Sequence, residues 1–479
     1  MCNLIGREKE IETLKRLYNS TQSQFVAIYG RRRVGKTFLV DETFKGKLTF
    51  RHSGLSPVDD KGKPHLLKDQ LKHFYRSLLL QGMKKSHCPT SWGDAFFMLE
   101  QHLRSIDNGK RQVVFLDELP WMDTPHSGFI TALEGYWNSW ACQRSNLMLI
   151  VCGSATSWVV DNLINNHGGL YGRLTYEIKL SPFSLCECEH FYKKNGIRMS
   201  RYDMVQSYMI LGGIPYYLNY LDNKLSMSQN IDTLFFNSNA KLKDEYDRLF
   251  SSVFKNPDEM KRIVEFLYTR RAGYTRMEIL KGLGIQEGGA LTKCLRALIA
   301  SDFVVKYVPF GVSTRYERYK VIDPFCMFYI HFLSGKGNIT PDLWASGNQQ
   351  SVISWRGYAF EELCFNHINQ IRAALSIGGV NSTISAFTID GDCKEDGAQI
   401  DLLINRSDNV VNMCEIKFYN DDFAVTKDYA RVLLRRQNVL AEKLPKKVVV
   451  HPTLITTYGL KDNEYCGSFT STVTIDDLF

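Results

Sequence analysis

An apolar run that breaks into a glycine-bounded loop is the stretch of this chain best suited to chemistry. The run covers residues 25–29 and is followed by the spacing Gly30-x-x-x-x-Gly35-Lys36-Thr37. Glycines let the backbone wrap a phosphate, a lysine reaches the β- and γ-phosphates, and a hydroxyl ligates Mg²⁺. A strand before the loop and a helix after it are the required context. The pattern therefore predicts a nucleotide-binding P-loop.

A second apolar run, residues 113–116, ends in two carboxylates, Asp117 and Glu118. A parallel strand that is buried on both faces needs such an uninterrupted run. Downstream of a P-loop, we expect Asp117 to hold Mg²⁺ through water and Glu118 to polarise the water that attacks the nucleotide. The alternative is an ordinary strand end with solvated acids, which the presence of the P-loop disfavours.

Two further polar residues are candidates for the same site. Residues 147–153 predict another buried strand, and its end places Ser154 beside the γ-phosphate edge of the sheet, where a polar sensor sits in many ATPases. Arg173 is a candidate to supply charge to the phosphates, in cis or toward a neighbouring subunit's nucleotide. An ordinary surface position fits Arg173 nearly as well.

Composition indicates a globular protein with several domains. The length of 479 residues predicts roughly three domains, and 44% hydrophobic residues are enough for packed cores. The first residues lack an apolar leader and no stretch reaches the roughly 18 apolar residues of a membrane span, so we expect a cytoplasmic protein without a membrane partner. Twelve cysteines scattered among apolar neighbours are typical of a reducing compartment. The net charge of +8 permits a nucleic-acid partner without requiring one.

Several short motifs in a fixed order carry a family resemblance across the first half of the chain. They are Ile5-Gly6-Arg7-Glu8, the loop from Gly30 to Thr37, Leu116-Asp117-Glu118, Gly153-Ser154-Ala155, Tyr171-Gly172-Arg173-Leu174 and Gly212-Gly213-Ile214-Pro215-Tyr216-Tyr217. Together they resemble the archaeal-type ATPase family of AAA-like proteins, which is related to signal-transduction ATPases. The resemblance implies an ATP-binding switch with Gly6 and Arg7 near the adenine, a core over residues 1–180 and a helical lid over residues 181–243. It implies no particular substrate.

From about residue 244 the pattern changes to three helices followed by two strands. The helices are expected at residues 260–270, 275–284 and 289–300, and the strands at 303–308 and 316–321. Thr275-x-x-Glu278 is a capping box that opens the second helix, and Gly284 ends it. This order predicts a winged helix over residues 244–333.

The third of these helices has one apolar and one polar face. We expect an inward face of Leu291, Leu295, Leu298 and Ile299 and an outward face of Thr292, Lys293 and Arg296. The outward face suits a DNA major groove. The alternative is a module that only packs between domains, and both interpretations stay open.

The last expected domain covers residues 345–479 and contains a second acidic cluster. Asp401 begins the first strand of a predicted hairpin, and Glu415-x-Lys417 ends the second strand. Residues two apart in a strand share a face, so Glu415 and Lys417 can meet Asp401 across the pair. Two carboxylates and a lysine can hold Mg²⁺ and orient a water beside a phosphodiester.

A helix that bears Glu361 precedes this cluster, and a basic helix of residues 425–440 follows it. Together these elements resemble the PD-(D/E)XK restriction-endonuclease-like superfamily over roughly the last 130 residues. On that resemblance Asp401, Glu415 and Lys417 match the catalytic positions, and Glu361 matches the upstream helical acid. The sequence lacks the common proline before Asp401. A structural ion pair is the alternative, but two acids with only one lysine to neutralise them favour a metal.

The expected architecture is α/β: a P-loop NTPase parallel sheet with a helical lid, a winged-helix middle domain and a restriction-endonuclease-like C-terminal domain. Two functional classes stay open. The first is an ATP-regulated, Mg²⁺-dependent nuclease that acts on DNA in processing or defence. The second is an ATP-dependent regulator that binds DNA or a protein, with the C-terminal fold as a non-catalytic platform. A protein partner or a homo-oligomer fits either class.

Overall fold

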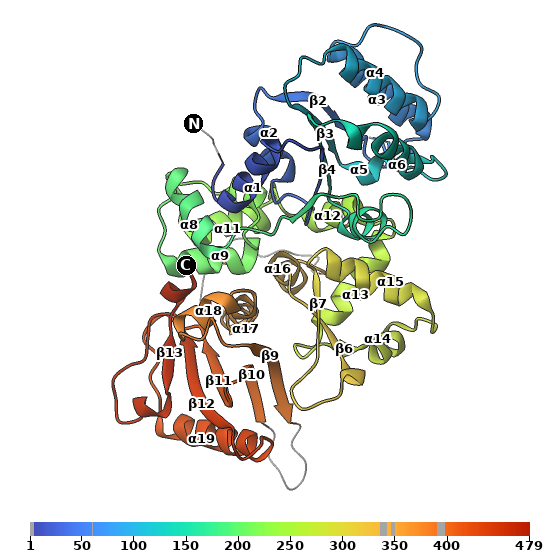
Figure 1. Ribbon diagram of the computed structural model, residues 1–479. Coiled ribbons are helices and arrows are strands. Elements are labelled where there is room, and N and C mark those ends of the chain that lie inside the picture. Colours follow the sequence, from blue (N-terminus) through green and yellow to red (C-terminus); the bar gives the residue numbers. More distant parts are fainter. Residues whose placement is uncertain (1–3, 60, 336–342, 346–349, 390–397) are drawn as a thin grey trace. The chain divides into compact units, whose positions relative to one another are not determined.

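The computed structural model describes residues 4–59, 61–335, 343–345, 350–389 and 398–479 (Figure 1). The chain forms two compact units. The first unit comprises the chain up to Pro182 together with Asp247–Pro257 and Arg296–Asp302. The second comprises Phe183–Tyr246, Asp258–Leu295 and Phe303–Phe479. Within the described residues no helix is both long enough and apolar enough to span a membrane.

The first unit is built on a parallel sheet of five strands in the order β2-β3-β4-β1-β5. The strands are β1 Gln24–Tyr29, β2 Leu48–Ser53, β3 Gln112–Asp117, β4 Leu147–Gly153 and β5 Tyr176–Lys179. Each pairing between neighbours in this sheet is parallel. Every residue of β3 and of β4 is buried, as a strand covered on both faces requires. The predicted parallel α/β sheet is confirmed.

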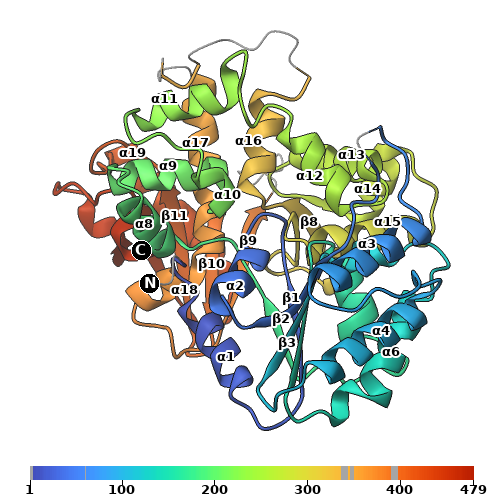
Figure 2. The same cartoon turned by 90° about the horizontal axis from the view of Figure 1, so that it is seen from above.

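Helices cover both faces of this sheet (Figure 2). They are α1 Glu8–Tyr18, α2 Lys36–Thr43, α3 Leu67–Leu80, α4 Trp92–Ser105, α5 Leu119–Met122, α6 Phe129–Ser139 and α7 Thr156–Val159. Figure 2 shows α1 and α2 on one side of the strands and α3, α4 and α6 on the other. A hydrophobic core lies on the second side, where Phe74 and Phe129 both pack against Trp92. This arrangement leaves the carboxyl ends of the strands as the edge on which the candidate residues are placed.

The second unit begins with short helices. They are α8 Leu185–Lys194, α9 Arg201–Leu211, α10 Pro215–Leu218 and α11 Met227–Ile231. A capping box between Ser184 and Glu187 starts α8. The helical path breaks after α9: Gly213 has φ of 64°, and a Cβ there would lie 2.3 Å from the carbonyl oxygen of Phe183. Only glycine fits this close approach.

The middle of the chain holds four helices and a small antiparallel sheet. They are α12 Glu245–Val253, α13 Pro257–Tyr268, α14 Arg276–Leu283 and α15 Gly289–Ala300, with the strands β6 Tyr274–Thr275, β7 Val304–Tyr307 and β8 Arg318–Val321 in the order β6-β8-β7. The capping box at Thr275 and the left-handed C-cap Gly284 are as predicted. Leu291, Leu295 and Leu298 are buried, also as predicted. The strands are shorter than expected, and the identity of this region as a winged helix stays a prediction.

The rest of the second unit is a five-stranded mixed sheet in the order β13-β12-β11-β10-β9, preceded by helices. The elements are α16 Pro324–Phe332, α17 Gln350–Asn366, α18 Ile368–Ala374, β9 Ser382–Ile389, β10 Ala398–Arg406, β11 Val410–Lys417, α19 Lys427–Glu442, β12 Val449–Thr456 and β13 Ser471–Val473. β10 and β11 form the predicted antiparallel hairpin, with Leu402 opposite Cys414. β11, β12 and β13 run parallel, and α19 packs its apolar side on the sheet. The predicted helix that bears Glu361 is α17, which begins at Gln350.

Candidate functional sites

The P-loop joins β1 to α2 at the carboxyl end of β1. Gly30 has φ of 139°, and a Cβ there would lie 2.3 Å from the carbonyl oxygen of Leu180. Gly35 has φ of 93° and is the left-handed N-cap of α2. Both backbone conformations favour glycine, so the two fixed glycines of the motif have a local structural reason. The N-terminus of α2 follows directly, as an anion-binding loop requires.

Lys36 is buried and its ammonium group lies inside the loop. Its Nζ donates to the carbonyl oxygens of Gly30 at 2.9 Å and Arg31 at 3.0 Å, and to Oγ of Ser154 at 3.0 Å. Burial lowers the pKa of Lys36, while the nearby carboxylates, chiefly that of Glu118, oppose this shift. The lysine is thus held at the point where the motif predicts the phosphates.

Thr37 and Asp117 meet at the start of α2. Thr37 Oγ1 donates to Asp117 Oδ2 at 2.9 Å, and the buried Asp117 also accepts from the thiol of Cys152. A hydroxyl oxygen and a carboxylate oxygen are ligands that suit Mg²⁺, which proteins usually hold through one or two carboxylates together with substrate phosphates. Among the described residues no group of three or more His, Cys, Asp or Glu is placed to hold a metal. The pair fits a nucleotide-dependent ion rather than an all-protein cage.

Glu118 is joined to Ser154 by two hydrogen bonds. Ser154 donates from its backbone N to Oε2 at 3.0 Å and from its Oγ to Oε1 at 2.5 Å. This is possible because β4 lies between β1 and β3, so that the end of β4 separates the P-loop from the acidic pair. Glu118 has φ of 49°, a left-handed conformation in which it caps α5. The structure therefore brings Lys36, Ser154 and Glu118 into one hydrogen-bonded chain.

The predicted residues Arg7 and Arg173 differ in whether they contact the P-loop. Arg7, with φ of 66° after Gly6 at 63°, is buried and donates to the carbonyl oxygens of Ser181 at 2.6 Å and Val34 at 3.5 Å. It thus contacts the P-loop directly. Arg173 is exposed, and in the described part of the chain its side chain forms no hydrogen bond or ion pair. Its role stays a prediction.

Sequence reasoning missed two residues that support this site. Cys152 is fully buried, and burial raises the pKa of its thiol well above the usual range, so it remains a neutral donor to Asp117. Gln70 on α3 bonds through its amide to the carbonyl oxygen of Trp121, which lies just after Glu118. The signal for Cys152 was its place next to the end of β4. Nothing local indicated Gln70, because its partner is distant in the sequence.

The second acidic cluster lies on β10 and β11. Asp401 Oδ2 accepts from the backbone N of Ile416 at 3.2 Å. Lys417 Nζ lies 4.0 Å from Asp401 Oδ2 and 3.4 Å from Glu415 Oε2. The hairpin therefore brings Asp401, Glu415 and Lys417 together, as the two-residue spacing indicated.

Two residues of α19 also reach Glu415, whose side chain has no exposed surface. The Tyr429 hydroxyl donates to Oε2 at 2.7 Å, and Arg436 Nη1 donates to Oε1 at 2.5 Å. The expectation that Lys417 alone neutralises the two acids is therefore wrong. Helical spacing carried a signal for Arg436, because it lies on the same side of α19 as the buried Leu433 and Leu440.

Glu361 approaches the cluster from α17. Burial, and next the charge of Asp401, raise the pKa of Glu361 to about 8. Arg271 Nη1 lies 4.0 Å from its Oε1. Burial and the charge of Glu415 likewise raise the pKa of Asp401. A divalent ion between Asp401 and Glu415 would fit the donor chemistry, but it would compete with Arg436 and Lys417 for the same oxygens.

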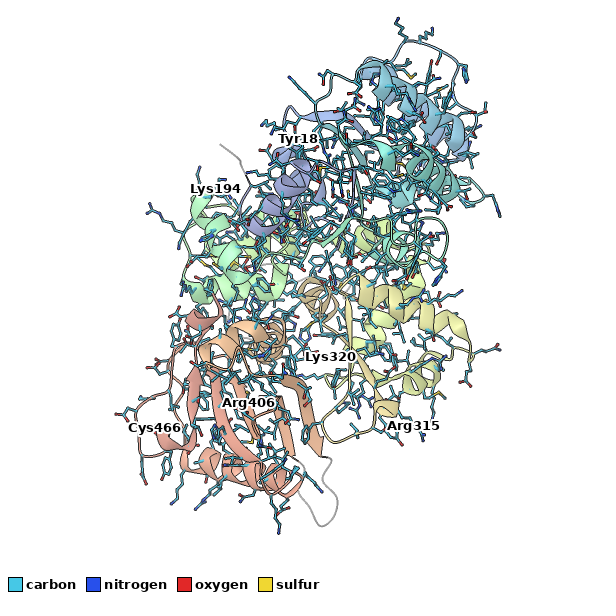
Figure 3. All side chains as sticks on the ribbon, in the orientation of Figure 1. Tyr18, Lys194, Arg315, Lys320, Arg406 and Cys466 are labelled. Atoms are coloured by element: carbon cyan, nitrogen blue, oxygen red, sulfur yellow. The ribbon has the colours of Figure 1, made fainter. Side chains whose placement is uncertain are left out.

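The next residue of α17 makes a separate buried ion pair. Glu362 Oε1 lies 2.7 Å from Nζ of Lys320 on β8, and both side chains are almost fully buried. The Lys320 ammonium also lies 4.1 Å from the centre of the Phe365 ring. Figure 3 marks Lys320 among the side chains that surround it.

Comparison with known proteins supports the reading of the first half of the chain. Residues 4–221 match the model of a family described as an ATPase domain predominantly from Archaea. The chain therefore carries an archaeal-type ATPase domain, as the ordered motifs implied. The match ends before the middle and C-terminal elements described above.

Individual proteins are also similar to this chain. An uncharacterised protein of Methanocaldococcus jannaschii is 24% identical over 447 residues, which cover 91% of this chain and 92% of that protein. An uncharacterised ATP-binding protein of the same organism is 39% identical over 49 residues, or 10% of this chain and 83% of that protein. The solved structure of a Walker-type ATPase of Pyrococcus abyssi is 18% identical, with a TM-score of 0.48, over 68% of this chain and 96% of its own.

Proposed function

We propose that this chain, through its archaeal-type ATPase domain, is an ATP-binding and ATP-hydrolysing switch that works with Mg²⁺. In this proposal Lys36 contacts the phosphates, Thr37 and Asp117 hold the metal, and Glu118 orients the attacking water. Mg²⁺ when bound would neutralise charge on the phosphates. The observation that carries the proposal is the hydrogen-bonded chain from Lys36 through Ser154 to Glu118.

Ser154 sets the direction of this series of hydrogen bonds. Its hydroxyl accepts from the phosphate-contacting lysine and donates to the carboxylate that must act on water. Consecutive hydrogen bonds polarise one another, so loss of the bond that Lys36 donates to Ser154 should weaken the bond that Ser154 donates to Glu118. We assign Ser154 as the residue that couples phosphate binding to the position of Glu118.

Two variants test the assignment with separate readouts. Lys36→Ala removes the main charge at the phosphates and should abolish tight binding of a fluorescent ATP analogue. Glu118→Gln keeps the shape of the side chain and should retain binding but lose hydrolysis by about a hundredfold or more. Unchanged phosphate release in both variants would exclude this site.

The C-terminal cluster supports a second candidate function, a Mg²⁺-dependent nuclease that acts on DNA. The observation in its favour is the convergence of Asp401, Glu415 and Lys417 on two neighbouring strands. The competing proposal is a non-catalytic platform that binds DNA or a protein. The observation in its favour is that Arg436 and Tyr429 already bond the two carboxylate oxygens of Glu415. A cleavage assay on single-stranded, duplex and branched DNA, with and without ATP and Mg²⁺ or Mn²⁺, distinguishes the two.

The exposed face of α15 is the proposed DNA contact of the middle elements. Thr292, Lys293 and Arg296 are all exposed on it, as the sequence predicted. Arg296 also forms an ion pair with Asp161 at 3.1 Å, which lessens its availability to phosphates. Lys293 is therefore the stronger candidate of the two cations for DNA contact.

A further inference from the structure

Positive charge is concentrated in one short segment of the first unit. Residues 61–87 contain seven lysines and arginines and one acidic residue, Asp69, a net charge of +6. The whole chain has a net charge of only +8. Asp59 and Asp60 directly precede the segment, and with them its net charge is +4, which is half that of the whole chain.

Helix α3 arranges part of this charge in a line. Lys68, Lys72 and Arg76 follow one another at a spacing of four residues and are all exposed. A rise of 1.5 Å per residue puts successive members roughly 6 Å apart along one flank of the helix. The side that faces the core is formed instead by Leu71, Phe74 and Leu78. We call Lys68, Lys72 and Arg76 the α3 stripe.

The charge of the α3 stripe is not neutralised locally. Within the described ranges none of its three residues forms an ion pair. Asp69 lies on the same helix, but its carboxylate accepts from the backbone N of Leu66 at 2.9 Å and caps the helix start. Exposed Lys84 and Lys85 extend the positive surface beyond the end of α3, whereas Lys61 and Lys63 lie next to Asp59, whose carboxylate accepts from the backbone N of both.

The helix that bears the α3 stripe is held in place. Gln70, which is fully buried, accepts from the backbone N of Leu55 at 3.0 Å and donates to the carbonyl oxygens of Leu55 at 2.9 Å and Trp121 at 2.8 Å. A cation on a fixed helix loses less conformational freedom on binding than one on a loop. The α3 stripe is therefore a preorganised line of positive charge.

We propose that the α3 stripe binds the phosphate backbone of duplex nucleic acid. A duplex presents a regular line of phosphates with about one negative charge per 1.7 Å of axis, which complements a straight row of cations. Three long cationic side chains contact phosphates without reading bases, so the binding should be independent of sequence. This proposal concerns other residues than Lys293 of α15, and its binding step does not depend on ATP hydrolysis.

Salt dependence provides the test. The triple variant Lys68→Ala, Lys72→Ala, Arg76→Ala should weaken binding of the full-length protein to a short fluorescent DNA duplex about tenfold or more at low salt. The slope of log affinity against log salt should become shallower by about 2.7, because three phosphate contacts contribute about 0.9 each. Fluorescence anisotropy at several salt concentrations, without ATP, measures both. Changing the duplex sequence should leave the effect the same.

Helix α1 offers a matched control. It has three exposed cations, Lys9, Lys15 and Arg16, but also three glutamates, so its charge is balanced. Alanine at these three positions removes the same charge and should leave the slope unchanged. Equal losses in both triple variants, or no duplex binding by the wild type at low salt, would overturn the proposal.

Two further measurements separate the possible failures. Thermal unfolding should be nearly unchanged in the α3 variant, since the three side chains are exposed. If the variant loses binding to anionic phospholipid vesicles but not to the duplex, the surface is a membrane contact and the proposal is wrong. Loss of ATP hydrolysis would appear in the Lys36 and Glu118 variants and would not affect this binding assay.

Discussion

The two acidic sites of this chain are alike in composition and differ in what holds their carboxylates. Each has two acids and a lysine: Asp117, Glu118 and Lys36 in the first unit, and Asp401, Glu415 and Lys417 in the second. In the first unit neutral donors bond the acids: Thr37 and Cys152 to Asp117, and Ser154 to Glu118. In the second unit a cation takes part as well, because Arg436 bonds Glu415 together with the neutral hydroxyl of Tyr429.

This difference has an electrostatic consequence. A hydroxyl or thiol donor orients a carboxylate but leaves its negative charge available to a metal ion. A guanidinium cancels the charge, and a metal must then displace it or share the oxygens with it. The first site is thus better prepared for Mg²⁺ than the second, although the sequence patterns suggest equal readiness.

The largest expected effect concerns cleavage. If the second site is a nuclease despite its cations, Asp401→Ala and Lys417→Ala should each reduce metal-dependent DNA cleavage by about a hundredfold or more. ATP hydrolysis should remain largely intact in both variants. The non-catalytic platform would be supported if the wild-type protein cleaves no DNA or RNA and its melting temperature does not shift with Mg²⁺ or Mn²⁺.

Arg436 provides the direct test of the comparison. Arg436→Met keeps much of the side-chain volume but leaves the buried Glu415 with fewer partners, and should lower the free energy of unfolding by about 3 kcal/mol. Added Mg²⁺ should recover part of this loss by replacing the lost charge. Urea unfolding with and without Mg²⁺ measures both effects. A variant that Mg²⁺ does not stabilise would show that the second site binds no metal even when the arginine is removed.

Glu361 predicts a pH dependence. Its pKa is raised from 4.5 to about 8, so the folded protein binds more protons than the unfolded chain between these values. Stability contributed by this group is therefore lost as pH rises from about 4.5 to about 8. Glu361→Gln should flatten this decline and be relatively more stable than the wild type at pH 8. Thermal melts across that range give the slope, and parallel curves for the two proteins would contradict the assignment.

The smallest expected effect is on α15. Replacing Lys293 and Arg296 by alanine should reduce the salt slope of DNA binding by up to about two. The change should be nearer one, since Arg296 already pairs with Asp161. Restoring Lys293 alone should then recover most of the slope. A salt slope equal to that of the wild type would show that α15 serves in packing and does not contact DNA.

Features set by neighbouring residues were predictable from the sequence. The P-loop glycines, the capping box at Thr275 and the C-cap at Gly284 depend on local backbone geometry, and all are present. The pairing of β10 with β11 was expected from two strand segments that lie close together in the sequence. Residue types and spacing were therefore enough to place most of the candidate side chains.

Features set by distant partners were not predictable. Arg436 and Glu415 lie 21 positions apart. Helical spacing puts Arg436 on the same side of α19 as Leu433 and Leu440, but nothing in the sequence pairs it with Glu415. The grouping of residues 183–246 with the C-terminal elements likewise depends on tertiary packing, whereas the family match runs across that boundary to residue 221. Local patterns carry no information about such associations.

Helix α17 joins two interactions through consecutive residues. Glu361 faces Arg271 and the Asp401 cluster, while Glu362 is buried against Lys320 of β8. Successive side chains on a helix point about 100° apart and are fixed to one rigid backbone. A rotation or slide of α17 that lengthens the Lys320 bond must therefore also move the Glu361 carboxylate. A displacement of α17 at β8 would therefore reach the acidic cluster through the helix backbone, without a direct bond between Lys320 and that cluster.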